Sequence, residues 1–201
     1  MFQRGERMRK DTIRNSGINT IGSVNWGTHV CQLYHTKEDL MDILIPYLKA
    51  GLENNEFCIW ITSNIQEAKK ELRKSVSDLD LYMEKRQIEI ILYNDWYLKT
   101  GFFDLKGTLN NWIEKLNEAL TSGYDGLRLT EDIFSLENEY WDDFMEYEKE
   151  IDRVIGHYQI MALCTYSLNE YNATKTMDII ENHQFALIKK DGKWRKLKNS
   201  M

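Results

Sequence analysis

The sequence predicts an α/β fold, a three-layer α/β/α sandwich built around a mainly parallel sheet. Two patterns carry this prediction. Short runs rich in β-branched and aromatic residues alternate with longer amphipathic segments, and an Asp-Gly pair near the C-terminus separates two further short apolar runs. A chain of 201 residues is long enough to form one such domain with a sizeable core.

Strands are expected where apolar residues dominate short runs, at 29–34, 57–62, 87–93, 126–130 and 157–166. The first of these is expected to be a central strand of the sheet. A C-terminal hairpin is expected to pair 185–188 with 194–197, because Asp191-Gly192 suits a two-residue turn.

Helices are expected at 36–52, 65–76, 77–84, 104–122, 139–155 and 173–182. In the fourth of these, apolar residues recur at spacings of three and four, which is the period of an amphipathic helix. The first helix has the clearest start, because Thr36 and Asp39 have the spacing of a capping box.

The chain is expected to divide into a polar N-terminal arm, residues 1–24, and a single domain, residues 25–201. Positions 1–15 hold five Arg or Lys residues against two acids and show no sustained period. We expect a solvent-exposed arm, with contact to nucleic acid or to a partner chain as alternatives.

Composition narrows the class of protein. The net charge of −6 and the isoelectric point near 5.3 argue against broad binding of nucleic acid. No apolar run approaches the length of a membrane span, and the N-terminus lacks the apolar region of a signal peptide. Three cysteines in apolar runs fit a reducing compartment. A cytoplasmic protein that contacts neither nucleic acid nor membrane is expected.

The turn after the first strand is unsuited to phosphate. It reads Tyr34-His35-Thr36-Lys37-Glu38, without the glycines that let backbone N–H groups approach phosphates in a nucleotide-binding loop. We therefore expect neither binding nor hydrolysis of nucleoside triphosphates.

Six motifs occur in the order of a known sensory family. They are His29-x-Cys31-x-x-Tyr34, Gly51-Leu52-x-x-x-Glu56-x-Cys58-x-Trp60-Ile61, Gly126-Leu127-Arg128, Tyr147-Glu148, Leu163-Cys164-Thr165-Tyr166 and His183. From about Gly27 to Trp194 the chain resembles the MEDS domain, the methanogen/methylotroph sensory domain. The resemblance implies a RecA-like fold without the phosphate loop and a role in sensing small carbon compounds.

The ligand site is expected beyond the carboxyl ends of the strands, where open α/β sheets bind ligands. These ends offer aromatic, amide and acidic groups but few cations, which favours a small uncharged or amine-like organic ligand. The proposed ligand-binding residues are Tyr34, His35, Asn94, Trp96, Glu131 and Tyr166.

His29 and Cys31 are a secondary ligand-binding candidate that rests on the family resemblance. They lie two apart on one strand and therefore share a face, with Cys164 as a possible neighbour. Packing in the core, ligand contact and binding of a soft metal remain alternatives. The spacing is unlike that of a structural zinc site, so no metal and no cofactor are assigned.

Arg128 is expected to form a structural ion pair with Glu148 or a nearby acid, because a buried arginine needs a partner. His157 and His183 are assigned structural roles, and no catalytic residue is assigned. The favoured function is a sensory or regulatory domain that acts as a homodimer, with a possible separate output protein. The alternatives are an enzyme that uses Glu131 or Asp132 with His35, and a structural protein.

Overall fold

The computed structural model describes residues 12–98, 104–132 and 140–198. Its main sheet contains β3 (His29–Tyr34), β4 (Phe57–Thr62), β5 (Ile88–Leu92), β6 (Leu127–Asp132), β7 (Ile160–Ser167), β8 (Phe185–Lys190) and β9 (Lys193–Lys198). The helices are α1 (Lys37–Glu53), α2 (Ile65–Arg73), α3 (Leu79–Glu84), α4 (Tyr93–Tyr97), α5 (Leu105–Thr121), α6 (Trp141–Ile155) and α7 (Ala173–Glu181). These positions agree with the sequence prediction except at α4, where a strand end was expected and a short helix is found.

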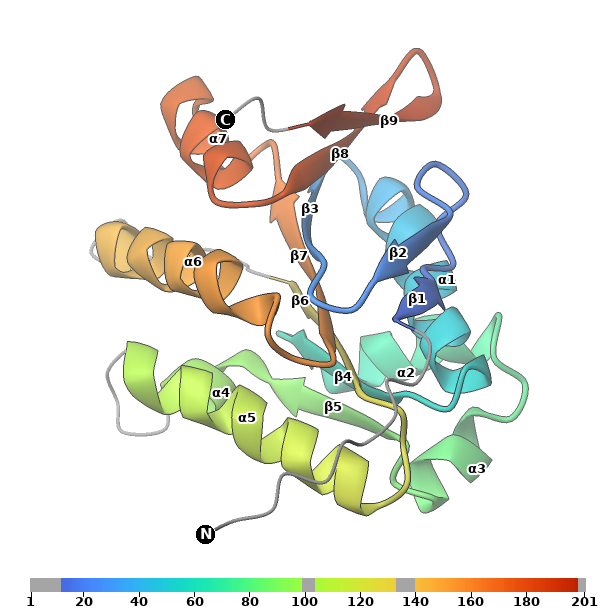
Figure 1. The fold of residues 1–201 in the computed structure, drawn as a ribbon. Coiled ribbons are helices and arrows are strands. Elements are labelled where there is room, and N and C mark those ends of the chain that lie inside the picture. Colours follow the sequence, from blue (N-terminus) through green and yellow to red (C-terminus); the bar gives the residue numbers. More distant parts are fainter. Residues whose placement is uncertain (1–11, 99–103, 133–139, 199–201) are drawn as a thin grey trace, which may run out of the picture.

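The seven strands are ordered β5-β4-β6-β7-β3-β8-β9, and every neighbouring pair is parallel except β8 and β9. Helices cover both faces of this sheet (Figure 1). One apolar core lies between the sheet and α1 to α3, and the other lies between the sheet and α4 to α7. The predicted three-layer α/β/α fold and the interior position of the first sheet strand, β3, are confirmed.

Side-chain alternation divides β3 between the two cores. Cys31 and Leu33 pack on the α6 side, whereas Val30 and Tyr34 pack on the α1 side. His29 shares the side of Cys31, because it reaches acidic groups of α6. The same six-residue strand therefore presents groups to two separate environments.

The segment before the sheet is a hairpin rather than a solvated arm. β1 (Ile13–Asn15) pairs antiparallel with β2 (Ser23–Asn25), and Ser16 and Ile18 in the connecting loop are buried. The expectation of an exposed arm is therefore wrong for residues 12–24, while residues 1–11 lie outside the described ranges. Ion pairs and hydrogen bonds to Arg14, Asn15 and Ser16 hold this hairpin in place, together with the packing of Ile18 and Val24, but its strands are too short to show an apolar period in the sequence.

Arg128 on β6 attaches the hairpin to the main sheet. Its guanidinium is fully buried, lies 2.5 Å from Glu56, and donates hydrogen bonds to the carbonyls of Asn15, Ser16 and Tyr47. Arg14 of the hairpin lies 2.8 Å from the other oxygen of Glu56. A structural ion pair was expected, but its partner is Glu56 on the α1 side.

Glu148, the partner named from the sequence, lies on α6 and belongs to the opposite side of the sheet. Arg128 is one position before Leu129, which packs in the core against α6, so alternation turns the arginine toward α1.

The C-terminal hairpin is confirmed. Asp191 and Gly192 both have positive φ, as the tight turn between β8 and β9 requires. β9 is the last strand of the sheet, and apart from Trp194 its residues are exposed and mostly basic. Within the described ranges, no helix combines the length and the apolar character needed to cross a membrane.

Candidate functional site

A pocket opens at the carboxyl ends of β3, β4 and β7, beside the first turns of α1 and α2. Its volume is about 290 Å³. Its wall combines apolar and aromatic groups with short polar groups. These residues are Tyr34, His35, Lys37, Leu40, Met41, Trp60, Thr62, Ser63, Asn64, Glu67, Ala68 and Ser167. We call this cavity the crest pocket.

The start of α1 is closed by its own side chains. Only His35 and Thr36 separate β3 from α1. The Thr36 hydroxyl accepts a hydrogen bond from the backbone N–H of Asp39, and the Asp39 carboxylate accepts one from the N–H of Thr36. Lys189 lies 2.8 Å from the same carboxylate. The expected capping box is therefore present, and it occupies N–H groups that a phosphate would need.

The six residues predicted for the crest do not form one site. Tyr34 and His35 line the crest pocket, whereas Glu131, Tyr166 and Trp96 are buried on the α6 side. The register pairs Tyr34 with Ser167 and Leu33 with Tyr166, so the two tyrosines point to opposite faces. Asn94 is exposed on α4 and does not line the crest pocket.

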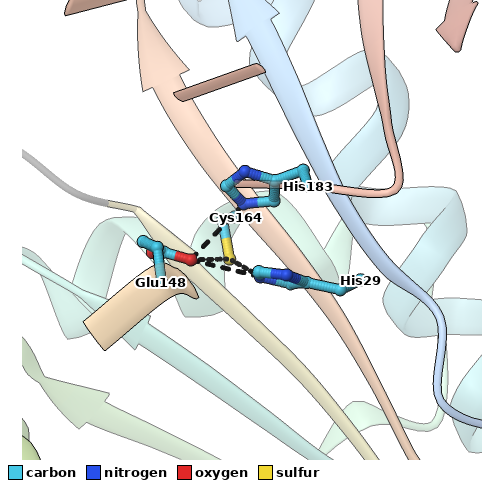
Figure 2. A group of neighbouring side chains, drawn as sticks. All are labelled: His29, Glu148, Cys164 and His183. Atoms are coloured by element: carbon cyan, nitrogen blue, oxygen red, sulfur yellow. Dashed lines mark hydrogen bonds and ion pairs between the residues drawn. The ribbon is translucent and has the colours of Figure 1, made fainter. Parts of the chain in front are cut away.

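A second constellation is fully buried between the sheet and α6. Figure 2 shows His29, Glu148, Cys164 and His183 pointing toward one another. Glu148 Oε2 lies 3.1 Å from His29 Nε2 and 3.4 Å from His183 Nε2. Cys164 Sγ lies 3.4 Å from His29 Nε2 and 3.8 Å from Glu148 Oε2. We call these four residues the buried cluster.

Neighbouring groups hold the buried cluster in place. His29 Nδ1 lies 3.3 Å from Asp152, and His183 Nδ1 lies 2.7 Å from the carbonyl oxygen of Ile179. Tyr166 donates a 2.9 Å hydrogen bond to Glu148 Oε1, and the Cys164 thiol donates a 3.1 Å hydrogen bond to Glu131 Oε1.

The two imidazoles carry different charges. Burial lowers the pKa of His29, but hydrogen bonds to Asp152 and Glu148 outweigh it and raise that pKa to about 9. Burial, together with the charge of His29, lowers the pKa of His183 to about 4. His29 is therefore the cation of the cluster at neutral pH, and His183 is neutral.

The two carboxyl groups also differ. Burial and the charge of Glu148 raise the pKa of Glu131 to about 8. Burial raises the pKa of Glu148, but the hydrogen bond and charge of His29, together with the hydrogen bond from Tyr166, bring it below its usual value. Burial raises the pKa of the Cys164 thiol well above its usual value, so this sulfur is protonated. The buried cluster thus combines one ionised carboxylate with one imidazolium.

The secondary candidate from the sequence lies at this cluster. His29 is a member, and Cys31 is the register neighbour of Cys164 on the adjacent strand. Glu148 and His183 were not identified as site residues, because one lies on a helix and the other follows α7. The motif order placed both residues in the family pattern, but spacing along the chain does not show that they converge.

The enzyme alternative gains no geometric support. Glu131 is hydrogen-bonded to Cys164 in the core, whereas His35 is exposed and lies beside Asn169 at the crest. The side chain of Asp132, the other acid considered, lies outside what the structure describes.

Comparison with known proteins now identifies the family. The model of the methanogen/methylotroph, DcmR sensory domain matches residues 28–184, which include the whole buried cluster and the crest pocket. The chain belongs to the MEDS family. As a MEDS domain it has a sensory or regulatory role.

Two known proteins are similar to this chain, one in sequence and one in fold. The transcriptional repressor DcmR of Methylorubrum extorquens is 22% identical over 187 residues, which cover 88% of this chain and 66% of that protein. The MEDS chain therefore spans just under two thirds of the length of this relative. The flagellar accessory protein FlaH from Methanocaldococcus jannaschii shares the fold, with a TM-score of 0.56 at 10% identity over 93% of this chain and 85% of that chain. The RecA-like fold expected from the family resemblance is confirmed.

Proposed function

We propose that this MEDS domain senses a small uncharged or amine-like organic molecule in the crest pocket, without turnover of a nucleotide. The observation that carries the proposal is the pocket itself. It lies at the carboxyl edge of a parallel sheet, where α/β folds bind ligands, beside a helix start that is closed to phosphate.

The size and wall of the crest pocket favour a small ligand. A volume of about 290 Å³ is near the lower end of the range for ligand sites, roughly 300–1,000 Å³. Tyr34 and Trp60 provide apolar surface, while Thr62, Asn64 and Ser167 provide hydrogen-bonding groups. Glu67, although it pairs with Lys37, adds a carboxylate that favours an amine over an anion.

The output of the domain is part of the same proposal. The relative from Methylorubrum extorquens is named a transcriptional repressor. We infer that occupancy here is passed to a separate regulatory partner or across a homodimer, since closed two-fold dimers are the commonest assemblies. Light scattering tests the second route. A mass near 23.9 kDa at every concentration would exclude the dimer.

Nuclear magnetic resonance can test the ligand site with methanol and methylamine as probes, together with any molecule that native mass spectrometry finds bound to the purified protein. Trp60 lines the crest pocket, whereas Trp112 is buried on the other side and donates to Tyr147. We expect saturable shifts of the Trp60 indole N–H signal and little change at Trp112.

Two variants sharpen this test. Trp60→Phe assigns the signal, and Met41→Trp fills the pocket from the half-buried face of α1 and should abolish binding. A molecule that shifts the Trp112 signal but leaves the Trp60 signal unchanged would show that the ligand binds on the α6 side of the sheet, and this would refute the proposal. Failure of every probe and of every co-purified molecule to bind would refute it as well.

A further inference from the structure

We propose that His29, Glu148, Cys164 and His183 bind one divalent transition-metal ion, of which zinc fits best. This metal site is separate from the crest pocket, and the inference does not depend on the proposed ligand. The four residues come from β3, α6, β7 and the segment after α7, so a bound ion would join the central strands to two helical elements.

The spacing of the donor atoms suits a tetrahedral ion. Bonds of about 2.0–2.3 Å to nitrogen, oxygen and sulfur place neighbouring ligand atoms about 3.3–3.8 Å apart. Four of the six distances in the buried cluster fall between 3.1 and 3.8 Å. The remaining two, from His183 to His29 and to Cys164, are within 4.8 Å. Binding of an ion therefore requires His183 Nε2 to move closer to His29 and Cys164.

The donor atoms are also oriented as metal ligands usually are. Both histidines direct Nε2 into the cluster, while Nδ1 is held by Asp152 in one ring and by the Ile179 carbonyl in the other. The Tyr166 hydroxyl holds the outer oxygen of Glu148. Such outer hydrogen bonds fix the tautomer and direction of a ligating group, and a purely apolar core has no need of them.

Charge is balanced in both states of the site. Without metal, the imidazolium of His29 offsets the carboxylate of Glu148. A divalent ion displaces one proton from His29 Nε2 and one from the Cys164 thiol, leaving a neutral imidazole, a thiolate and a carboxylate around it. Two protons leave for the two positive charges that enter, so the net charge of this buried region is unchanged. Glu131 lies 3.1 Å from the sulfur, and its protonated form can donate a hydrogen bond to the thiolate while both displaced protons leave the region.

The donor set selects the class of metal. Two imidazoles, one thiolate and one carboxylate are borderline-soft ligands, which disfavours magnesium and calcium and favours zinc or cobalt(II). Four protein ligands in a fully buried position correspond to a closed site that stabilises structure.

An acidic groove lies next to the buried cluster. It runs between α6 and α7, the helix that carries Glu148 and the helix that precedes His183. Five acidic residues and two basic residues line it. Its negative potential would raise the local concentration of cations on this side of the sheet.

The test uses the full chain, purified without a histidine tag and stripped of metal with a chelator. We expect equilibrium dialysis followed by elemental analysis to find one zinc per chain. Cobalt(II) should bind at the same stoichiometry and give a thiolate-to-cobalt charge-transfer band, together with the visible bands of a tetrahedral site. Less than half an equivalent of either metal on the folded wild-type chain would overturn the proposal.

Matched cysteine variants assign the site. Cys164→Ser should lose the charge-transfer band and bind zinc at least tenfold more weakly. Cys58→Ser removes a thiol that is equally buried on the opposite side of the sheet, and it should keep both the band and the affinity. His183→Gln should also weaken zinc binding at least tenfold.

Circular dichroism checks that each variant is folded. If a cluster variant does not fold, the wild-type stoichiometry and the cobalt spectrum still decide the matter. Cobalt that binds without a thiolate band, or a folded Cys164→Ser chain with unchanged zinc affinity, would show that the ion is held elsewhere and refute this site.

Discussion

Arg128 connects three parts of the chain through one side chain. It joins β6 to Glu56, to the end of the N-terminal hairpin and to α1 through the Tyr47 carbonyl. An arginine suits this position because its planar group donates in several directions at once. Gly51 makes room for it, since a Cβ at that position would lie 2.6 Å from Arg128 Cδ.

We predict that Arg128→Met destabilises the protein by about 3–5 kcal/mol, because Glu56 would be left buried with Arg14 as its one remaining cationic partner among the described residues. Urea unfolding followed by circular dichroism measures this loss. Arg73→Met is the matched control. It removes an exposed ion pair with Asp80 and should change stability by less than about 1 kcal/mol. Similar losses in the two variants would contradict the assignment of Arg128 as a structural centre.

Part of the candidate site could be predicted from individual residues of the sequence. His29 and Cys31 were named as a candidate because of the family resemblance, and strand periodicity added that the two side chains share one face. Tyr34 and Tyr166 were wrongly placed in one site because each lies near the carboxyl end of its strand. The register between β3 and β7 turns the two side chains to opposite faces of the sheet, and the sequence alone does not show this register. Glu148 and His183 converge with His29 only through long-range packing, which spacing along the chain does not encode.

Among the elements, α1 has the most specific sequence signature. Its capping box was predicted from Thr36 and Asp39, but Lys189, which ties the helix start to β8, was not. The hydrogen bond and charge of Lys189 hold the pKa of Asp39 below its usual value. The ionised form of Asp39 therefore stabilises the folded state.

We predict that Asp39→Asn destabilises the protein at neutral pH and that this difference shrinks as the pH falls. The folded pKa lies below the unfolded value of about 3.9, so the stabilisation is complete above that value and is lost as the pH falls through the folded pKa. Urea midpoints at about pH 7, 5 and 3 give the profile. Asp80→Asn, an exposed carboxylate, is the control. A difference that stays constant or grows toward low pH would contradict this role of the charge.

The connection between β3 and α1 leads to a second prediction at this scale. Two residues and an occupied cap cannot form a phosphate cradle, so equilibrium dialysis with magnesium-ATP should detect no binding at micromolar concentrations. A nucleotide-binding protein with an intact phosphate loop serves as the positive control. Micromolar binding would show that the helix start is more accessible than its hydrogen bonds indicate.

Most elements of the sheet and its helices followed from local patterns, because buried parallel strands and amphipathic helices have distinct periods. The exceptions have specific causes. Trp96 and Tyr97 were placed at a strand end, yet they pack into the core from the short helix α4. β1 and β2 are three residues each and lack an apolar repeat, so local sequence gave no signal for them.

For the whole molecule, we predict that the N-terminal hairpin is part of the folded domain. A chain that begins at Trp26 loses two carbonyl acceptors of Arg128 and one cationic partner of Glu56. Because hydrogen bonds to a charged group contribute about 1.5–3 kcal/mol each, the loss should be at least about 3 kcal/mol. Urea unfolding compares this chain with the full-length protein and with one that begins at Thr12, which retains the hairpin. Equal stability of all three chains would show that the hairpin does not contribute to the folded domain.

The charged strand β9 restricts how copies of this protein can assemble. If two copies joined their sheets at this edge, β9 would pair with an identical strand, and its exposed lysines and Arg195 oppose that approach. A two-fold dimer formed through this edge would bring like charges face to face. A dimer should therefore avoid the β9 edge, so that a signal between subunits would not pass through a β-ladder formed by two copies of this strand.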